Sequence, residues 1–111
     1  MKLWLDDERP PPDDSWLVFR TAEDLLEWLG PNMDKVELLS LDHDLGEGRQ
    51  TGYDVLLCLE GLAYLCRPVS FTIEVHSDNP VGRRNMLLAI ENIRKIREAL
   101  KIPEGSDVVG V

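Results

Sequence analysis

The sequence predicts an α/β domain built on a mostly parallel sheet of four or five strands flanked by helices. Short apolar runs alternate with longer amphipathic segments along the 111 residues, which is typical of an α/β sheet. Three of these runs end directly in polar residues capable of chemistry. The carboxyl ends of parallel strands share one edge of a sheet, so we expect the three polar groups to converge there. They are Asp6-Asp7-Glu8, Asp42-His43-Asp44 and His76-Ser77-Asp78-Asn79.

The strands are predicted from short runs of apolar and β-branched residues. The connection between the first two strands contains Pro10, Pro11 and Pro12, and proline interrupts a helix because it lacks the amide donor. A parallel connection usually contains a helix. Either this loop spans the crossover in an extended form, or the two strands pair differently. The four predicted strands are Lys2–Leu5, Trp16–Arg20, Val36–Leu41 and Val69–Val75.

Three helices are predicted between and after these strands. Thr21 caps a helix over residues 22–29, which Gly30-Pro31 is expected to end. A strongly apolar helix follows over residues 53–65 and ends near Pro68. Asn79-Pro80 is a favourable start for the last helix. Its apolar residues recur every three or four positions until Pro103 ends it. The expected organisation is one domain over residues 1–102 and a tail over 103–111 with room for a short extra strand.

Charge and composition exclude several classes of protein. The formal charge is −9, and residues 83–101 carry +4, which leaves −13 for the remainder. An extended nucleic-acid surface is therefore not expected, because cations that neutralise phosphates supply that affinity. The sequence contains no apolar run long enough to span a membrane, and acids at positions 6–8 argue against a signal peptide. With Cys58 and Cys66 interpreted as buried free thiols, we expect a cytoplasmic protein.

The acids at the strand ends are candidate ligands of a divalent metal. Asp6 and Asp7 follow the first strand, and past a strand end both side chains can turn toward one point. Asp42 and Asp44 share a face by their spacing. Carboxylates packed together disfavour each other's ionised form unless a cation joins them. Oxygen ligands of this kind suit Mg²⁺, or Mn²⁺ in its place. Glu8 is expected to face solvent.

The remaining polar residues suggest phosphate chemistry. His76 is a candidate general acid or base, with Ser77 beside it. His43 should point away from Asp42 and is more consistent with a structural role. The start of the last helix offers free amides for an anion, and Asn79 and Arg83 are the candidate phosphate-binding residues there. Acids on one side and an anion site on the other indicate a site that handles phosphoryl groups.

Four motifs together resemble the cyclic-phosphate-processing receiver-like domains, a divergent branch of the receiver fold of two-component response regulators. The resemblance covers about residues 2–90. Each motif alone is common, and it is their order and separation that carry the resemblance. The motifs are Leu3-Trp4-Leu5-Asp6-Asp7-Glu8-Arg9-Pro10, Ser40-Leu41-Asp42-His43-Asp44-Leu45-Gly46, Thr51-Gly52-Tyr53-Asp54 and His76-Ser77-x-Asn79-Pro80-x-Gly82-Arg83.

The resemblance implies a flavodoxin-like, three-layer fold and action on cyclic phosphate ends of RNA or nucleotides. By similarity, Asp6 and Asp7 match the paired metal-binding acids of receivers, and Asp42 or Asp44 matches the phosphoacceptor aspartate. Ser77 or His76 takes the place of the receiver's hydroxyl residue. Two departures stand out: the proline loop replaces the first receiver helix, and no lysine closes a fifth strand. A signalling role is therefore less expected than hydrolysis.

The leading hypothesis from the sequence is a metal-dependent phosphoesterase that opens a 2′,3′-cyclic phosphate. Its expected ligand is a small phosphorylated molecule or an RNA terminus, with Mg²⁺ or Mn²⁺ as cofactor. Whether Asp42 attacks phosphorus or only holds metal is open. The alternatives are a non-catalytic module that binds a phosphorylated ligand or protein, and a receiver phosphorylated on Asp42. A haloacid-dehalogenase-type phosphatase is less consistent with the short chain.

Overall fold

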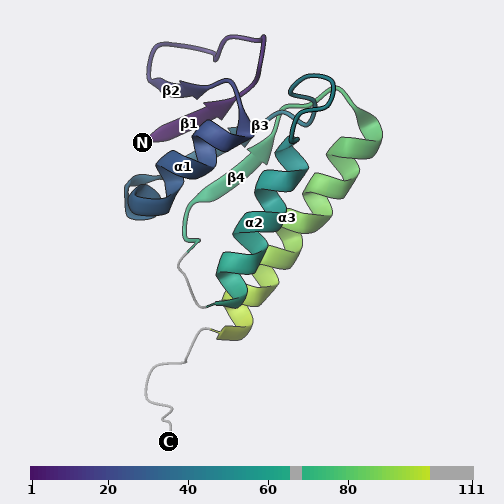
Figure 1. Cartoon of the computed structure of the whole chain (residues 1–111). Coiled ribbons are helices and arrows are strands. Elements are labelled where there is room, and N and C mark those ends of the chain that lie inside the picture. Colours follow the sequence, from purple (N-terminus) through teal and green to yellow (C-terminus); the bar gives the residue numbers. More distant parts are fainter. Residues whose placement is uncertain (66–68, 101–111) are drawn as a thin grey trace, which may run out of the picture.

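A computed structural model describes residues 1–65 and 69–100, and these residues form four strands, three α-helices and one 3₁₀ turn (Figure 1). The strands and helices alternate in the order that the sequence predicts, after an initial pair of strands. The elements are β1 (Lys2–Leu5), β2 (Trp16–Phe19), α1 (Ala22–Asn32), η1 (Met33–Lys35), β3 (Leu38–Leu41), α2 (Gly52–Tyr64), β4 (Thr72–Val75) and α3 (Pro80–Leu100).

All four strands are parallel and lie in the order β2-β1-β3-β4. This arrangement confirms the predicted fold class, a receiver-like or flavodoxin-like parallel sheet. The proline loop spans the first crossover without a helix, so β1 and β2 pair in parallel. Hydrogen bonds fasten the loop to the sheet: the indole N–H of Trp4 donates to the carbonyl of Arg9 at 2.9 Å, and Arg20 donates to the carbonyl of Asp6 at 2.9 Å.

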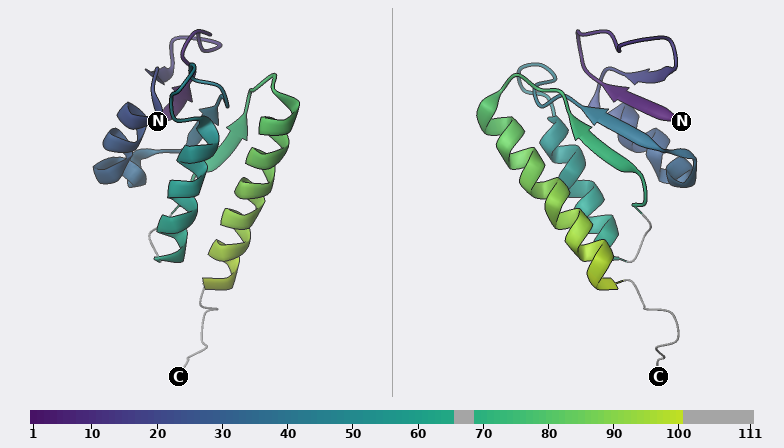
Figure 2. Two further views of the ribbon diagram at one scale, coloured as in Figure 1. Left: turned by 45° about the vertical axis from the view of Figure 1, so that its right-hand side comes forward. Right: turned by 180° about the vertical axis from the view of Figure 1, so that it is seen from behind.

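The three helices cover one face of the sheet. Crossovers from β2 to β3 and from β3 to β4 run in the same direction, and right-handed connections then place α1 and α2 on the same side. The right-hand view in Figure 2 shows the sheet from the opposite side, where no helix lies over the described strands. The described residues thus form two layers instead of the three implied by the resemblance, because the loop after β1 replaces the helix that would cover the second face.

A single apolar core fills the space between the sheet and the helices. Along β1 and β3, alternate residues point into this core, and those between them point to the uncovered face. Helix α3 contributes an inward stripe at three- and four-residue steps, as predicted. Helices α2 and α3 pack side by side (Figure 1). Among the central residues of the core are Leu3, Leu5, Leu39, Leu41, Leu25, Val55, Leu59, Met86 and Ile93.

Several boundaries differ from the predictions. Helix α1 continues through Gly30 and Pro31 to Asn32. A proline costs a helix one amide donor. In this last turn the Asn32 side chain also donates a hydrogen bond to the carbonyl of Trp28 at 2.7 Å. Strands β3 and β4 begin at Leu38 and Thr72, two and three residues later than predicted.

The prediction that Cys58 is buried was wrong. Cys58 is exposed, because Val55, Leu56, Leu59 and Ala63 form the inward side of α2 and Cys58 lies between them on the outer side. Predictions about Cys66, the helix end near Pro68, the stop at Pro103 and the tail 103–111 fall outside the described residues. Among the described helices, none has the length and apolar character that crossing a membrane requires.

Candidate functional site

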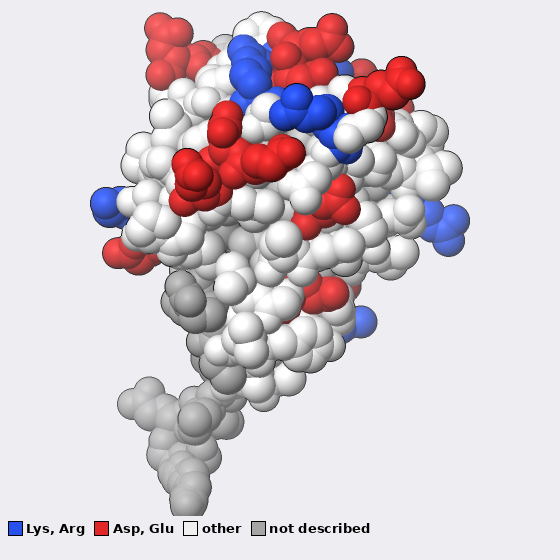
Figure 3. Space-filling model, in the orientation of Figure 1, with Lys and Arg blue, Asp and Glu red and all other residues white. Residues whose placement is uncertain are grey.

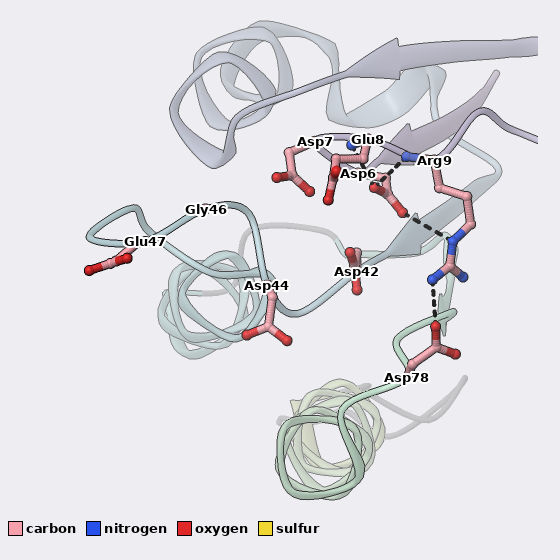
Figure 4. Close-up of a pocket in the computed structure, with 9 residues that line it drawn as sticks. All are labelled: Asp6, Asp7, Glu8, Arg9, Asp42, Asp44, Gly46, Glu47 and Asp78. Carbon is pink, nitrogen blue, oxygen red and sulfur yellow. Dashed lines mark hydrogen bonds and ion pairs between the residues drawn. The ribbon is translucent and has the colours of Figure 1, made fainter.

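Three of the four predicted metal-binding acids converge at the carboxyl end of the sheet. Asp6 and Asp7 follow β1, and Asp42 follows β3, the neighbouring strand. One carboxylate oxygen from each lies within 4.8 Å of the other two. Figure 4 shows the three side chains directed toward a common space. Because Leu5 and Leu41 are paired in register, the parallel sheet itself places these acids side by side.

Asp6 is the most buried of the three acids, with a side chain only 2% exposed. Its Oδ1 accepts hydrogen bonds from the amides of Glu8 and Arg9 at 2.9 and 2.8 Å. Its Oδ2 lies 3.1 Å from Nε2 of His76. Burial acts to raise the pKa of Asp6, but the two amide hydrogen bonds and His76 outweigh it, and the pKa falls below its ordinary value. Asp6 is therefore a carboxylate held ionised in a fixed orientation.

Asp42 has the opposite electrostatic situation. Burial raises the pKa of its carboxyl group, and the negative charge of Asp6 raises it further. Hydrogen bonds from the amide of His43, at 2.8 Å, and from the hydroxyl of Ser77 lower it only in part. Two adjacent acids with pKa values displaced in opposite directions are a sign of uncompensated negative charge.

The donor set of this cluster fits a hard divalent cation. Three carboxylate oxygens are the ligand type of Mg²⁺ and Mn²⁺. At a metal–oxygen distance of ~2.1 Å, octahedral ligands of Mg²⁺ lie about 3.0 Å apart when adjacent and about 4.2 Å apart when opposite. The three oxygens, within 4.8 Å of one another, would draw closer on binding one ion. Such an ion would also remove the repulsion that raises the pKa of Asp42. Asp6, Asp7 and Asp42 are thus the residues able to hold it.

His76 is locked in place beside Asp6. Its ring stacks on Trp4, with centroids 3.8 Å apart and planes inclined by 3°. Nδ1 lies 2.8 Å from the hydroxyl oxygen of Ser40, and Nε2 contacts Asp6. These contacts fit a neutral ring that donates from Nε2 and accepts at Nδ1. Burial lowers the pKa of His76 below its ordinary value, although the charge of Asp6 opposes this. The His76 side chain is only 14% exposed. Because its own position is fixed, its contact with Asp6 fixes the orientation of that carboxylate.

Asp44 lies apart from the three clustered acids, although it lines the same pocket. Its carboxylate contacts Nδ1 of His43 at 2.9 Å and the Asn79 amide at 3.2 Å. Hydrogen bonds from His43 and Asn79 lower the pKa of Asp44. The His43 ring packs against Gly82 so closely that a β-carbon there would lie 2.5 Å from ring atoms. Asp44, His43 and Asn79 together join the β3–α2 loop to the start of α3.

Ser77 and the predicted phosphate-binding residues Asn79 and Arg83 make hydrogen bonds within the protein that stabilise the start of α3 and the end of β4. Asn79 caps α3, because its Oδ1 accepts the amide of Gly82 at 3.0 Å. Ser77 accepts the amide of Asn79 at 3.1 Å and is buried next to Asp42. The Arg83 side chain donates to the carbonyl of Val75 at 2.9 Å. It lines a separate hollow with Arg84 and Leu87 and does not line the pocket that holds the acids.

Gly52, in the third motif, permits a close approach that positions Asp42. The amide of Gly52 donates to the carbonyl of His43 at 3.0 Å. A β-carbon on Gly52 would lie 1.9 Å from the carbonyl oxygen of Asp42, so only glycine fits here. Thr51 and Asp54 form a reciprocal capping box at the same turn. The start of α2 is thereby fixed against the end of β3.

The acids line an open pocket of about 600 Å³ at the end of the sheet. Figure 3 shows acidic side chains gathered at this end of the molecule, with basic side chains between them. Arg9 was not among the predicted site residues, yet it lines the pocket (Figure 4). Its position in the first motif, three residues after Asp6, was the available signal. The full lining is Asp6, Asp7, Glu8, Arg9, Asp42, Asp44, Gly46, Glu47 and Asp78.

Comparison with known proteins identifies the family. A family model described as the cyclic-phosphate processing receiver domain matches residues 1–92. Neither the curated proteins nor the solved structures gave a significant match. The matched region contains the four motifs, the whole parallel sheet and the acid cluster at its carboxyl edge. The chain belongs to the family of cyclic-phosphate processing receiver domains.

Proposed function

We propose that this domain is a metal-dependent phosphoesterase that opens cyclic phosphates, with 2′,3′-cyclic phosphate ends of RNA or nucleotides as substrates. One observation carries the proposal: oxygens of Asp6, Asp7 and Asp42 converge within 4.8 Å at an open pocket. Membership of a family named for cyclic-phosphate processing supplies the chemical class. An acid cluster of this kind would otherwise repel a phosphate group, and a cation explains how both can occupy one site.

A bound Mg²⁺ or Mn²⁺ would neutralise charge on the phosphate during attack by water. The side chains have separate tasks around it. Asp6, fixed by two amides and His76, presents one oriented carboxylate. Asp7 and Asp42 complete the set of acids. Asp42, which ends β3 and lines the pocket, is also placed to accept a proton from the attacking water.

In this proposal His76 acts through Asp6. Both of its ring nitrogens have partners, Ser40 and Asp6, and its ring is covered by Trp4. A general acid has to reach the leaving oxygen directly or through one water. Because His76 does not line the pocket, we assign it the role of holding Asp6 in position. Ser77 acts similarly on Asp42.

The substrate that enters the pocket is expected to be the terminus of an RNA strand or a small molecule. Seven acids and one arginine line the pocket, and the whole chain carries −9. A continuous nucleic-acid strand would meet repulsion along such a surface. A single terminal phosphate that reaches the acid cluster would not need an extended basic track.

The proposal is tested by incubating the protein with nucleoside 2′,3′-cyclic phosphates and Mg²⁺ or Mn²⁺, and following the ring opening by ³¹P NMR. We expect conversion to a monophosphate that stops when EDTA is added. Asp42→Asn should abolish turnover, whereas Asp44→Asn, a pocket acid outside the cluster, should retain it. Absence of turnover by the parent protein with all four nucleosides and both metals contradicts the proposal.

A second candidate is a non-catalytic module that binds a phosphorylated ligand. The fully bonded state of His76 favours it, because no histidine is free for proton transfer at the pocket. This candidate predicts that a cyclic nucleotide binds in the presence of metal and is recovered unchanged. Measuring binding and turnover on the same sample therefore separates the two candidates.

A further inference from the structure

Arg9 is the only basic side chain that lines the acidic pocket among the residues that the structure describes. It begins in the loop after β1 and reaches across to the loop after β4. Its Nη1 donates to the carbonyl of His76 at 3.1 Å, and its Nη2 donates to Asp78 at 2.7 Å. Its Nε lies 3.9 Å from Oδ2 of Asp6. Figure 4 shows the guanidinium group between Asp6 and Asp78.

This arrangement leaves the guanidinium group available to a ligand. A guanidinium carries five N–H donors in a fixed fork, and two of the five make the hydrogen bonds just described. The Asp78 side chain is 87% exposed, and an ion pair this exposed contributes little because water competes for both partners. The bond to the His76 carbonyl anchors the group at the pocket. A phosphate group offers a pair of oxygens that such a fork can bind with two parallel hydrogen bonds.

We infer that Arg9 binds the phosphate group of the ligand and that Asp78 is the anion it displaces. The inference rests on the proposed function, because it places the phosphate beside Asp6, Asp7 and Asp42. Arg9 takes the role that the sequence assigned to Arg83, whose side chain is bonded to Val75 outside the pocket. The carbonyl of His76 holds one end of the guanidinium while the other end turns from Asp78 to the phosphate.

The charge of the pocket favours phosphates with one negative charge over those with two. One divalent cation and Arg9 supply three positive charges against seven acids. A cyclic phosphodiester carries a single charge, whereas a phosphate monoester carries about −1.5 to −2 at neutral pH. The more highly charged monoester is repelled more strongly, so a product of ring opening is bound less tightly than its precursor. The seven acids are Asp6, Asp7, Glu8, Asp42, Asp44, Glu47 and Asp78.

The test measures affinity for adenosine 2′,3′-cyclic phosphate at saturating Mg²⁺, by calorimetry or as KM where the nucleotide is turned over, and Mg²⁺ binding separately by calorimetry. Arg9→Gln should weaken binding of the cyclic nucleotide about 10- to 100-fold, as expected for loss of a charged hydrogen-bonding group. Its Mg²⁺ affinity should not fall, because removing a positive charge cannot weaken a cation site. Arg9→Lys should recover only part of the loss, since an ammonium lacks the fork. Arg83→Gln is the matched control and should bind as the parent does.

Asp78→Asn distinguishes displacement from a structural role of the pair. If Asp78 competes with phosphate for Arg9, this variant binds the cyclic nucleotide several-fold more tightly than the parent. If the Arg9–Asp78 pair only shapes the loops, affinity falls. Adenosine 2′-monophosphate should bind the parent more weakly than the cyclic compound.

The outcomes separate this inference from the proposed function. Equal affinities of the parent and Arg9→Gln, or an equal loss in Arg83→Gln, overturn the assignment of Arg9. Binding that depends on Arg9 without any ring opening contradicts the phosphoesterase proposal and leaves Arg9 in place. A parent protein that binds Mg²⁺ but neither nucleotide at millimolar concentration overturns both.

Discussion

Replacing Asp42 by asparagine tests the acid cluster most directly, through stability instead of activity. Asparagine keeps the shape and the oxygen that accepts the His43 amide, but removes one negative charge. Two charges within 4.8 Å of each other repel by at least about 1 kcal/mol in water and about 3.5 kcal/mol at an effective dielectric constant of 20. Asp42→Asn without metal should therefore be more stable than the parent by at least about 1 kcal/mol. In a domain of this size that raises Tm by about 4 °C or more.

Magnesium should shift the balance back toward the parent. A ligand at a hundred times its Kd stabilises the folded state by about 2.7 kcal/mol, so Tm of the parent should rise with Mg²⁺ while Tm of Asp42→Asn should change little. Thermal unfolding at pH 7.5, with and without Mg²⁺, measures both effects. Asp44→Asn is the control, because Asp44 lies outside the cluster and its variant should still respond to Mg²⁺. A metal-free Asp42→Asn less stable than the parent, or an equal Mg²⁺ response in both, would refute the reasoning.

Three further predictions concern the elements around the site. Gly52→Ala should lower the free energy of unfolding by about 2–3 kcal/mol, because its β-carbon would meet the Asp42 carbonyl at 1.9 Å. Gly61→Ala, whose β-carbon would have nothing within 4 Å, should raise the free energy of unfolding by about 0.5–1 kcal/mol. Urea unfolding measures both changes. Thr51→Ala should lower the free energy of unfolding by about 1 kcal/mol in the same assay, because it removes the N-cap of α2. The folded state lowers the pKa of His76, so protonation favours unfolding. Stability should fall as pH drops from about 6.5 through the folded pKa, by up to ~1.4 kcal/mol per pH unit. His76→Gln should flatten this dependence below about pH 6.5, and an unchanged slope would contradict the assigned cause.

The convergence of the clustered acids could be predicted from the sequence, because the backbone topology alone decides their position. Asp6 and Asp42 directly follow strands that pair in register, and any parallel sheet with this strand order brings them together. The directions of long side chains depend on partners that only the folded structure supplies. Arg83 turns to a carbonyl on the outer edge of β4, and Arg9 reaches a loop 67 residues away. Neither acceptor is visible in the sequence.

The fold was predicted in its order of elements and less well at its boundaries and layers. Gly30-Pro31 is a strong local signal for a helix end, yet α1 continues to Asn32. In α2, apolar residues occur on nearly every side, and this hid the inward stripe that leaves Cys58 outside. The proline loop correctly indicated a missing helix. Its consequence, a sheet covered on one face only, needed the handedness of the later crossovers as well.

The uncovered face of the sheet also constrains how this site can evolve. Trp4 is 6% exposed and Ser40 is fully buried on that face, and the ring of His76 contacts both. In a domain wrapped on both sides, a helix would shield these residues, and the chemistry could vary independently of the packing. Here the same imidazole shields the β-strands and aims Asp6. A substitution at His76 therefore changes two things at once, the cover over Trp4 and Ser40 and the orientation of Asp6.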